Sequence, residues 1–73
     1  MQPTFDTKDF LQKQRVLFLT VVERAIYDMT EPKPAVREQA IDWLLHDDQD
    51  FPRICEMAGI SAASVRKSVL SRL

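Results

Sequence analysis

A chain of 73 residues has room for one small domain, and no second domain is expected. The net charge of −1 argues against a protein that coats nucleic acid regardless of sequence. The single glycine argues against a sheet protein, which needs glycine-rich turns, and the single cysteine excludes an internal disulfide. We therefore expect a soluble all-α protein in the reducing cytoplasm.

The first helix is expected from about residue 7 to residue 30. Residues 1–6 carry no periodic pattern and are expected to fray, with Asp6 or Thr7 as the helix cap. The run 16–22 also fits a buried strand by composition, but helix-forming residues flank it without a turn signal. It is far shorter than the ~20 residues that span a bilayer. The apolar face of the helix comprises Leu11, Phe18, Val22, Ala25 and Met29, spaced by three, four and seven residues.

The middle of this helix is apolar nearly all round. Such a helix is either central to its own domain or shared with a partner, and a chain this short gains stability from a second core. The sequence leaves open whether this helix lies at a homodimer interface or in a core formed within one chain. The residues expected to contact a second copy or another protein are Leu11, Phe18, Leu19, Val22 and Ile26.

Two prolines separate the first helix from the second. Pro32 and Pro34 both forbid the upstream helix from continuing, and Pro34 suits the first position of a new helix. We expect this second helix over residues 34–46, followed by a loop over residues 47–50 that is rich in aspartate. Its buried face is expected to comprise Val36, Ala40, Ile41, Leu44 and Leu45, with Trp43 at the edge.

The last third of the chain has the residue types that two short helices need to meet at a tight turn. A third helix is expected over 52–58 and a fourth from Ala62 to the C-terminus. Gly59 can adopt the positive φ of the turn, and Ser61 can cap the fourth helix. Small residues, Cys55 and Ala58, occupy the positions where the helices touch. The inner faces are expected to comprise Ile54, Ile60, Val65 and Val69.

The run FPRICEMAGISAASVRKSVL, residues 51–70, resembles the helix-turn-helix family of bacterial and phage regulators. That family usually has alanine where this chain has Cys55. A broader likeness, over about residues 35–73, is to small helix-turn-helix proteins of phages, prophages and gene transfer agents in Gram-negative bacteria. The resemblance implies sequence-specific binding of duplex DNA and regulation of transcription. Because one recognition helix gives limited affinity, we expect a dimer that places two recognition helices ~34 Å apart on a palindromic site.

The resemblance implies that the last helix, from Ala62 to Leu73, reads the DNA. Arg66 is the expected guanine contact, whereas Lys67 and Arg72 are expected to hold phosphates. The charge distribution fits, because residues 51–73 carry four cations against one acid, and residues 23–50 carry eight acids against three cations. The full predicted DNA-binding set is Arg53, Ser61, Ala62, Ala63, Ser64, Arg66, Lys67, Ser71 and Arg72.

Other interpretations of the same residues stay open. Cations on an amphipathic terminal helix also fit a solvated face that has no partner. The apolar first helix or the acidic middle would suit docking on a larger machine such as RNA polymerase. A packaging subunit similar to that of terminase, which would form rings, is a third interpretation.

No catalytic, metal or cofactor site is expected. His46 beside Asp47, Asp48 and Asp50 is interpreted as a helix end followed by capping residues, because metal sites need several ligands at fixed spacing. Cys55 falls on an inner face, where a thiol is inert. The chain is therefore expected not to be an enzyme.

Overall fold

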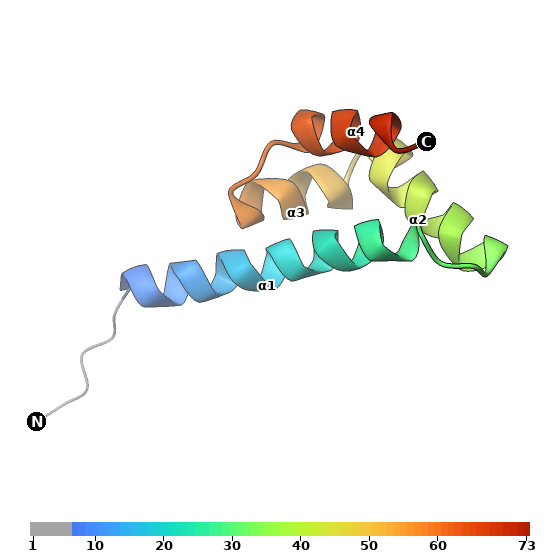
Figure 1. Cartoon of the computed structure of the whole chain (residues 1–73). Coiled ribbons are helices and arrows are strands. Elements are labelled where there is room, and N and C mark those ends of the chain that lie inside the picture. Colours follow the sequence, from blue (N-terminus) through green and yellow to red (C-terminus); the bar gives the residue numbers. More distant parts are fainter. Residues whose placement is uncertain (1–6) are drawn as a thin grey trace, which may run out of the picture.

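The computed structural model describes residues 7–73 and is helical, with no strand in that range (Figure 1). Four helices follow one another: α1 (Thr7–Asp28), α2 (Pro34–His46), α3 (Asp50–Ala58) and α4 (Ala62–Ser71). The predicted all-α class is confirmed. Helix α1 ends two residues earlier than expected, and α3 begins at Asp50 rather than at Pro52. The expectations for residues 1–6, including a cap at Asp6, lie outside the described residues.

The break between α1 and α2 is built by the two prolines and the residue between them. Lys33 adopts an extended conformation, with φ −73° and ψ 116°, because a residue that precedes proline is disfavoured in the helical region. Pro34 then opens α2, where its missing N–H costs no helical hydrogen bond. Within residues 7–73, no helix combines the length and apolar character that crossing a membrane requires.

The three shorter helices lie on one side of α1 (Figure 1). Helix α1 packs mainly against α3 and, toward its C-terminal end, against α2, which crosses it. Helix α4 contacts α2 and α3 rather than resting closely on α1. The N-terminal part of α1 projects beyond the end of α3 (Figure 1).

All four helices contribute to one core. Its fully buried side chains are Phe51, Leu44, Val22, Val69 and Cys55. The rings of Trp43 and Phe51 meet edge to face, with centroids 5.2 Å apart. Such a pair is favourable beyond the area that it buries. Val22 was expected to contact a partner; the structure instead places it in the core, where it is 1% exposed and unavailable to another molecule.

Gly59 is the residue that lets α3 turn into α4. Its φ of 75° lies in the left-handed region, and the N–H of Ile60 donates to the carbonyl of Cys55 at 3.0 Å across the turn. A side chain is disfavoured in this conformation by about 1–2 kcal/mol. A Cβ at residue 59 would lie 3.7 Å from Arg15 Cδ, an ordinary contact, so the penalty of a substitution comes from the backbone.

We expect Gly59→Ala to lower the free energy of unfolding by about 1–2 kcal/mol, measured by urea denaturation. Gly59→Asn should lower the free energy of unfolding by less, because asparagine tolerates the left-handed region better than alanine. An alanine variant as stable as the parent would contradict this account of the turn.

Candidate nucleic-acid interface

The corner between α3 and α4 consists of Gly59, Ile60 and Ser61. Ser61 is extended, with φ −84° and ψ 120°, and its Oγ accepts a hydrogen bond from the Ser64 N–H at 3.2 Å. This is the N-cap predicted from the sequence, and it satisfies one of the amides that a helix start leaves without a partner. The small residues Cys55 and Ala58 are buried as predicted. Of the predicted inner faces, Val69 is buried, and three residues are half-buried against the core: Ile54, Ile60 and Val65.

Cys55 is a packing residue of this corner. It is 1% exposed and unpaired with another cysteine. Burial raises the pKa of the Cys55 thiol above its ordinary value, and the nearby charge of Arg66 opposes that rise only in part. The thiol therefore stays neutral at physiological pH and behaves as a small apolar group.

Arg66 does not face outward, which corrects the expectation that it reads guanine. Its Nε donates to the carbonyl of Leu44 at 2.9 Å, and its Nη2 donates to the carbonyl of Asp47. Its guanidinium also stacks over the Phe51 ring, 4.8 Å from the centroid. The physical reason is that the end of α2 leaves carbonyls without helical partners, and a guanidinium can donate to several at once.

Asp47 completes this junction from the other side. Its Oδ2 accepts a hydrogen bond from the Phe51 N–H at 2.7 Å and so satisfies one of the amides that the start of α3 leaves without a helical partner. We call Leu44, Asp47, Phe51 and Arg66 the α2–α3 clasp. In the clasp, a residue of α4 holds together the end of one helix and the beginning of the next.

The remaining predicted DNA-binding residues differ in exposure. Ala62 is half-buried and packs against the core, so it is also not free for a base. On α4, Ala63, Ser64, Lys67 and Ser71 share the outward side, judged from their spacing of three and four residues. The predicted residues that are exposed are Arg53, Ser61, Ala63, Ser64, Lys67, Ser71 and Arg72.

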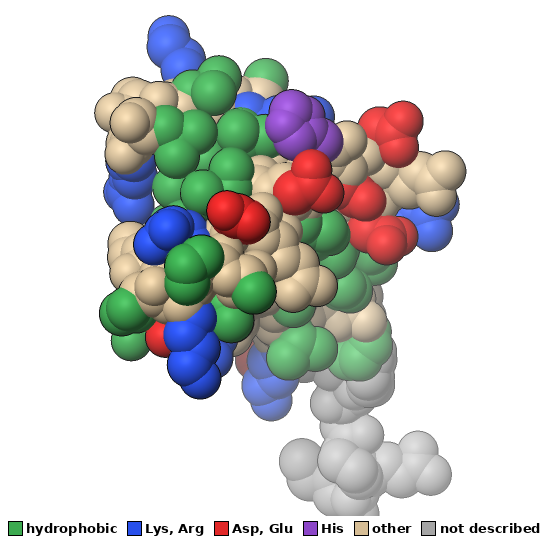
Figure 2. All heavy atoms as spheres, turned by 90° about the vertical axis from the view of Figure 1, so that its right-hand side faces the viewer, with side chains coloured by type: hydrophobic (Ala, Val, Ile, Leu, Met, Phe, Trp, Pro, Cys, Tyr) green, Lys and Arg blue, Asp and Glu red, His purple; other side chains and the backbone are tan. Residues whose placement is uncertain are grey.

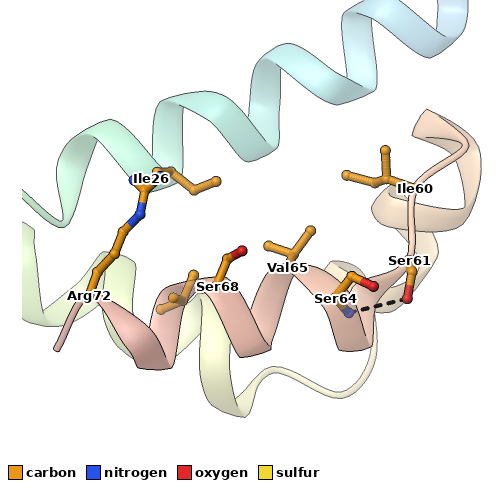
Figure 3. Close-up of a pocket in the computed structure, with 8 residues that line it drawn as sticks. Ile26, Ile60, Ser61, Ser64, Val65, Ser68 and Arg72 are labelled. Atoms are coloured by element: carbon orange, nitrogen blue, oxygen red, sulfur yellow. Dashed lines mark hydrogen bonds between the residues drawn. The ribbon is translucent and has the colours of Figure 1, made fainter.

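A groove of about 340 Å³ separates α4 from α1, and the sequence did not predict it (Figure 3). Ile26 of α1 faces Val65 of α4 across it (Figure 3), and Val69 also lines it. Hydroxyl groups and one cation line its α4 side, and no lining residue is acidic: Ser61, Ser64, Ser68 and Arg72. These four residues follow one another at intervals of three, four and four, so the sequence alone could have predicted that they share one polar side of this helix.

Charge is unevenly distributed over the surface. In the view of Figure 2, most acidic side chains gather near the histidine, and most lysine and arginine side chains lie along the left and lower edges. Among residues 7–73 there is no cluster of three or more His, Cys, Asp or Glu side chains that suits a metal ion. His46 is exposed at the end of α2, as the capping interpretation expects.

The chain was compared with protein-family models, with curated proteins and with solved structures. None of the three comparisons gives a match.

The residues expected to contact a partner do not form one surface. Besides the core residue Val22, Phe18 and Leu19 are half-buried, and Ile26 is half-buried in the groove beside α4. Leu11 alone of the five is exposed. A different set of apolar side chains on α1 is exposed and was not predicted: Phe10, Val16, Leu17, Val21 and Tyr27. The apolar face predicted from the three- and four-residue spacing is the covered side, because Val22 and Met29 are buried and Phe18 and Ala25 half-buried; only Leu11 of that face is exposed.

Proposed function

We propose that the protein binds duplex DNA through the outward side of α4 and regulates transcription in the cytoplasm of a bacterial cell. The observation that carries the proposal is the composition of that side. It presents Lys67, two serines, Ala63 and the exposed Leu70, and α4 contains no acidic residue that would repel phosphate. The helix begins at a capped corner, as in the helix-turn-helix regulators of phages and prophages that the sequence resembles.

Each exposed residue has a role in this proposal. Lys67 contacts a phosphate, with Arg53 and Arg72 at the edges of the contact. Ala63 is small enough to bring the helix near base edges, and the Ser64 hydroxyl donates to a base or a phosphate. Arg66 does not touch DNA but positions α4 through the α2–α3 clasp.

The test begins with selection from random duplexes, followed by a salt titration of the enriched site with the full chain. Lys67→Ala should weaken binding and reduce the slope of log affinity against log salt by about 1. Lys33→Ala is the matched control, because Lys33 is equally a surface lysine but lies in the turn between α1 and α2. Equal effects of the two substitutions, or binding that salt does not weaken, would overturn the proposal.

The groove between α1 and α4 favours a second candidate, docking of an acidic amphipathic helix from a larger protein such as RNA polymerase. The groove offers an apolar floor, Ile26, Val65 and Val69, and Arg72 at its edge. A partner helix with apolar and acidic side chains would match both. Ile26→Trp fills this groove from the α1 side, where no residue is assigned to DNA. It should abolish binding to purified polymerase and preserve DNA binding, whereas Lys67→Ala should do the reverse.

A further inference from the structure

Arg15 is an exposed cation of α1 that lies against the corner between α3 and α4. It precedes the core residue Val22 by two helical turns and therefore lies on the side of α1 that faces the other helices. Figure 1 shows the corner over the N-terminal half of α1. The Arg15 side chain runs along it: Cδ and Nε are 3.7 Å, and Cζ is 4.0 Å, from the position that a Cβ would have at Gly59. The guanidinium is thus held beside a turn that is far away in the sequence.

The charge of Arg15 has no partner among residues 7–73. Arg24, on the same helix, is paired with Asp28, whereas Arg15 forms no ion pair, hydrogen bond or ring contact with another residue of that range. The carbonyls that close the turn, those of Cys55 and Glu56, already accept hydrogen bonds from backbone N–H groups of the turn. A guanidinium has five N–H donors, so Arg15 keeps them for an acceptor outside this part of the chain.

The corner places this cation beside the start of α4. One residue separates Gly59 from the N-cap, Ser61. Ser61 and Ser64 are exposed and line the groove between α1 and α4 (Figure 3), and Ser64 also belongs to the outward side of α4. Lys67 lies about 9 Å further along the helix axis than Ser61, at 1.5 Å per residue. Along the direction of α4, the two hydroxyl groups therefore lie between an exposed cation of α1 and one of α4, and residues 57–73 include no acid.

We propose that Arg15 contacts a DNA phosphate, so that the DNA-binding surface extends from α4 across the corner onto α1. This inference rests on the proposed binding of duplex DNA through α4. A guanidinium suits the role because it can donate two parallel hydrogen bonds to one phosphate. Its contact with the corner restricts the side chain before DNA binds, so less conformational entropy is lost on binding. The contact fixes where the duplex lies on the protein and carries no information about its bases.

The first experiment repeats the salt titration of the enriched duplex with Arg15→Ala. The slope of log affinity against log salt should fall by about 1, the effect of losing one phosphate contact. The loss of affinity should accordingly be roughly 3–4-fold larger at 50 mM than at 200 mM salt. Arg24→Ala is the matched control and should leave the slope unchanged. Arg24 is also an exposed arginine of α1, but it lies nine residues along the helix and so about 180° around it from Arg15.

A double variant, Arg15→Ala with Lys67→Ala, distinguishes this inference from the proposed function. If both contacts exist, the slope of the double variant should fall by about 2. A reduced slope for Lys67→Ala alone, with the parental slope for Arg15→Ala, would remove the contact at Arg15 and leave DNA binding through α4 in place. Parental slopes for both single variants would contradict both proposals.

The second experiment, ethylation interference, separates a phosphate contact from a structural role of Arg15 in the corner. With the wild-type protein, ethylation of each contacted phosphate should weaken binding. With Arg15→Ala, one of these phosphates should become insensitive to ethylation, and the others should keep their effect. Weaker binding with the full set of sensitive phosphates would give Arg15 a structural role and overturn the contact. Circular dichroism should show the parental helical content and Tm for Arg15→Ala, since the side chain is exposed.

Discussion

Phe51→Ala should be the most destabilising single substitution in this chain, with a loss of about 3–5 kcal/mol. The ring is 0% exposed and is covered by the edge of Trp43 and by the guanidinium of Arg66. Alanine would leave a cavity at the place where α2, α3 and α4 meet. A domain of this size has roughly 4–11 kcal/mol of stability in total, so the loss removes a large part of it.

Urea denaturation followed by circular dichroism measures this effect. Tyr27→Ala is the control, because Tyr27 is also a large aromatic residue but is 63% exposed. Its substitution should change the free energy of unfolding by about 0.5 kcal/mol or less. Similar losses for the two variants would show that Phe51 is not the centre of the core.

Arg66→Ala is the second large effect, with an expected loss of about 2–3 kcal/mol in the free energy of unfolding. The substitution removes the donors to the carbonyls of Leu44 and Asp47, and hydrogen bonds from charged groups contribute about 1.5–3 kcal/mol. It also removes the stacking on Phe51. Arg66→Lys should recover little of this, because a lysine ammonium cannot bond both carbonyls in the planar geometry of a guanidinium.

Thermal denaturation and DNA binding, measured on the same variants, separate the structural role of Arg66 from a base contact. If Arg66 has a structural role, both Arg66 variants should have a lower Tm than the parent protein. At a temperature where the variants are fully folded, the base preferences should be unchanged. Lys67→Ala should show the opposite pattern, with an unchanged Tm and weaker DNA binding. If the Arg66→Ala protein kept the parental Tm but had a relaxed base preference, Arg66 would be a guanine contact. That result would contradict its structural role in the α2–α3 clasp.

Local chemistry made much of the fold predictable from the sequence. The prolines at 32 and 34 end one helix and begin the next, because proline lacks an N–H and restricts the residue before it. Gly59 and Ser61 set the corner between α3 and α4 for equally local reasons, a positive φ and a side-chain cap. These effects act within about four residues, so neighbours along the chain suffice to predict them.

The functional surface depended on contacts between residues far apart in the chain. Arg66 has the same sequence signature as Lys67, but its partner Leu44 lies 22 residues away. Only the packing of α4 beside the end of α2 makes Arg66 a structural residue and leaves Lys67 exposed. A predicted base contact was therefore wrong because the sequence does not show which carbonyls lack partners.

The same limit applies to α1. Its sequence established a long apolar helix, and apolar residues on nearly every side showed that one helix neighbour would not cover them all. Its periodic apolar face was predicted and is covered at Val22 and Met29, but the sequence contained no reason for Leu17, which lies off that face, to be left 65% exposed. That choice was made by the tertiary structure, because burial depends on where α2 and α3 pack, and helix packing is decided by the summed contacts of several elements rather than by one.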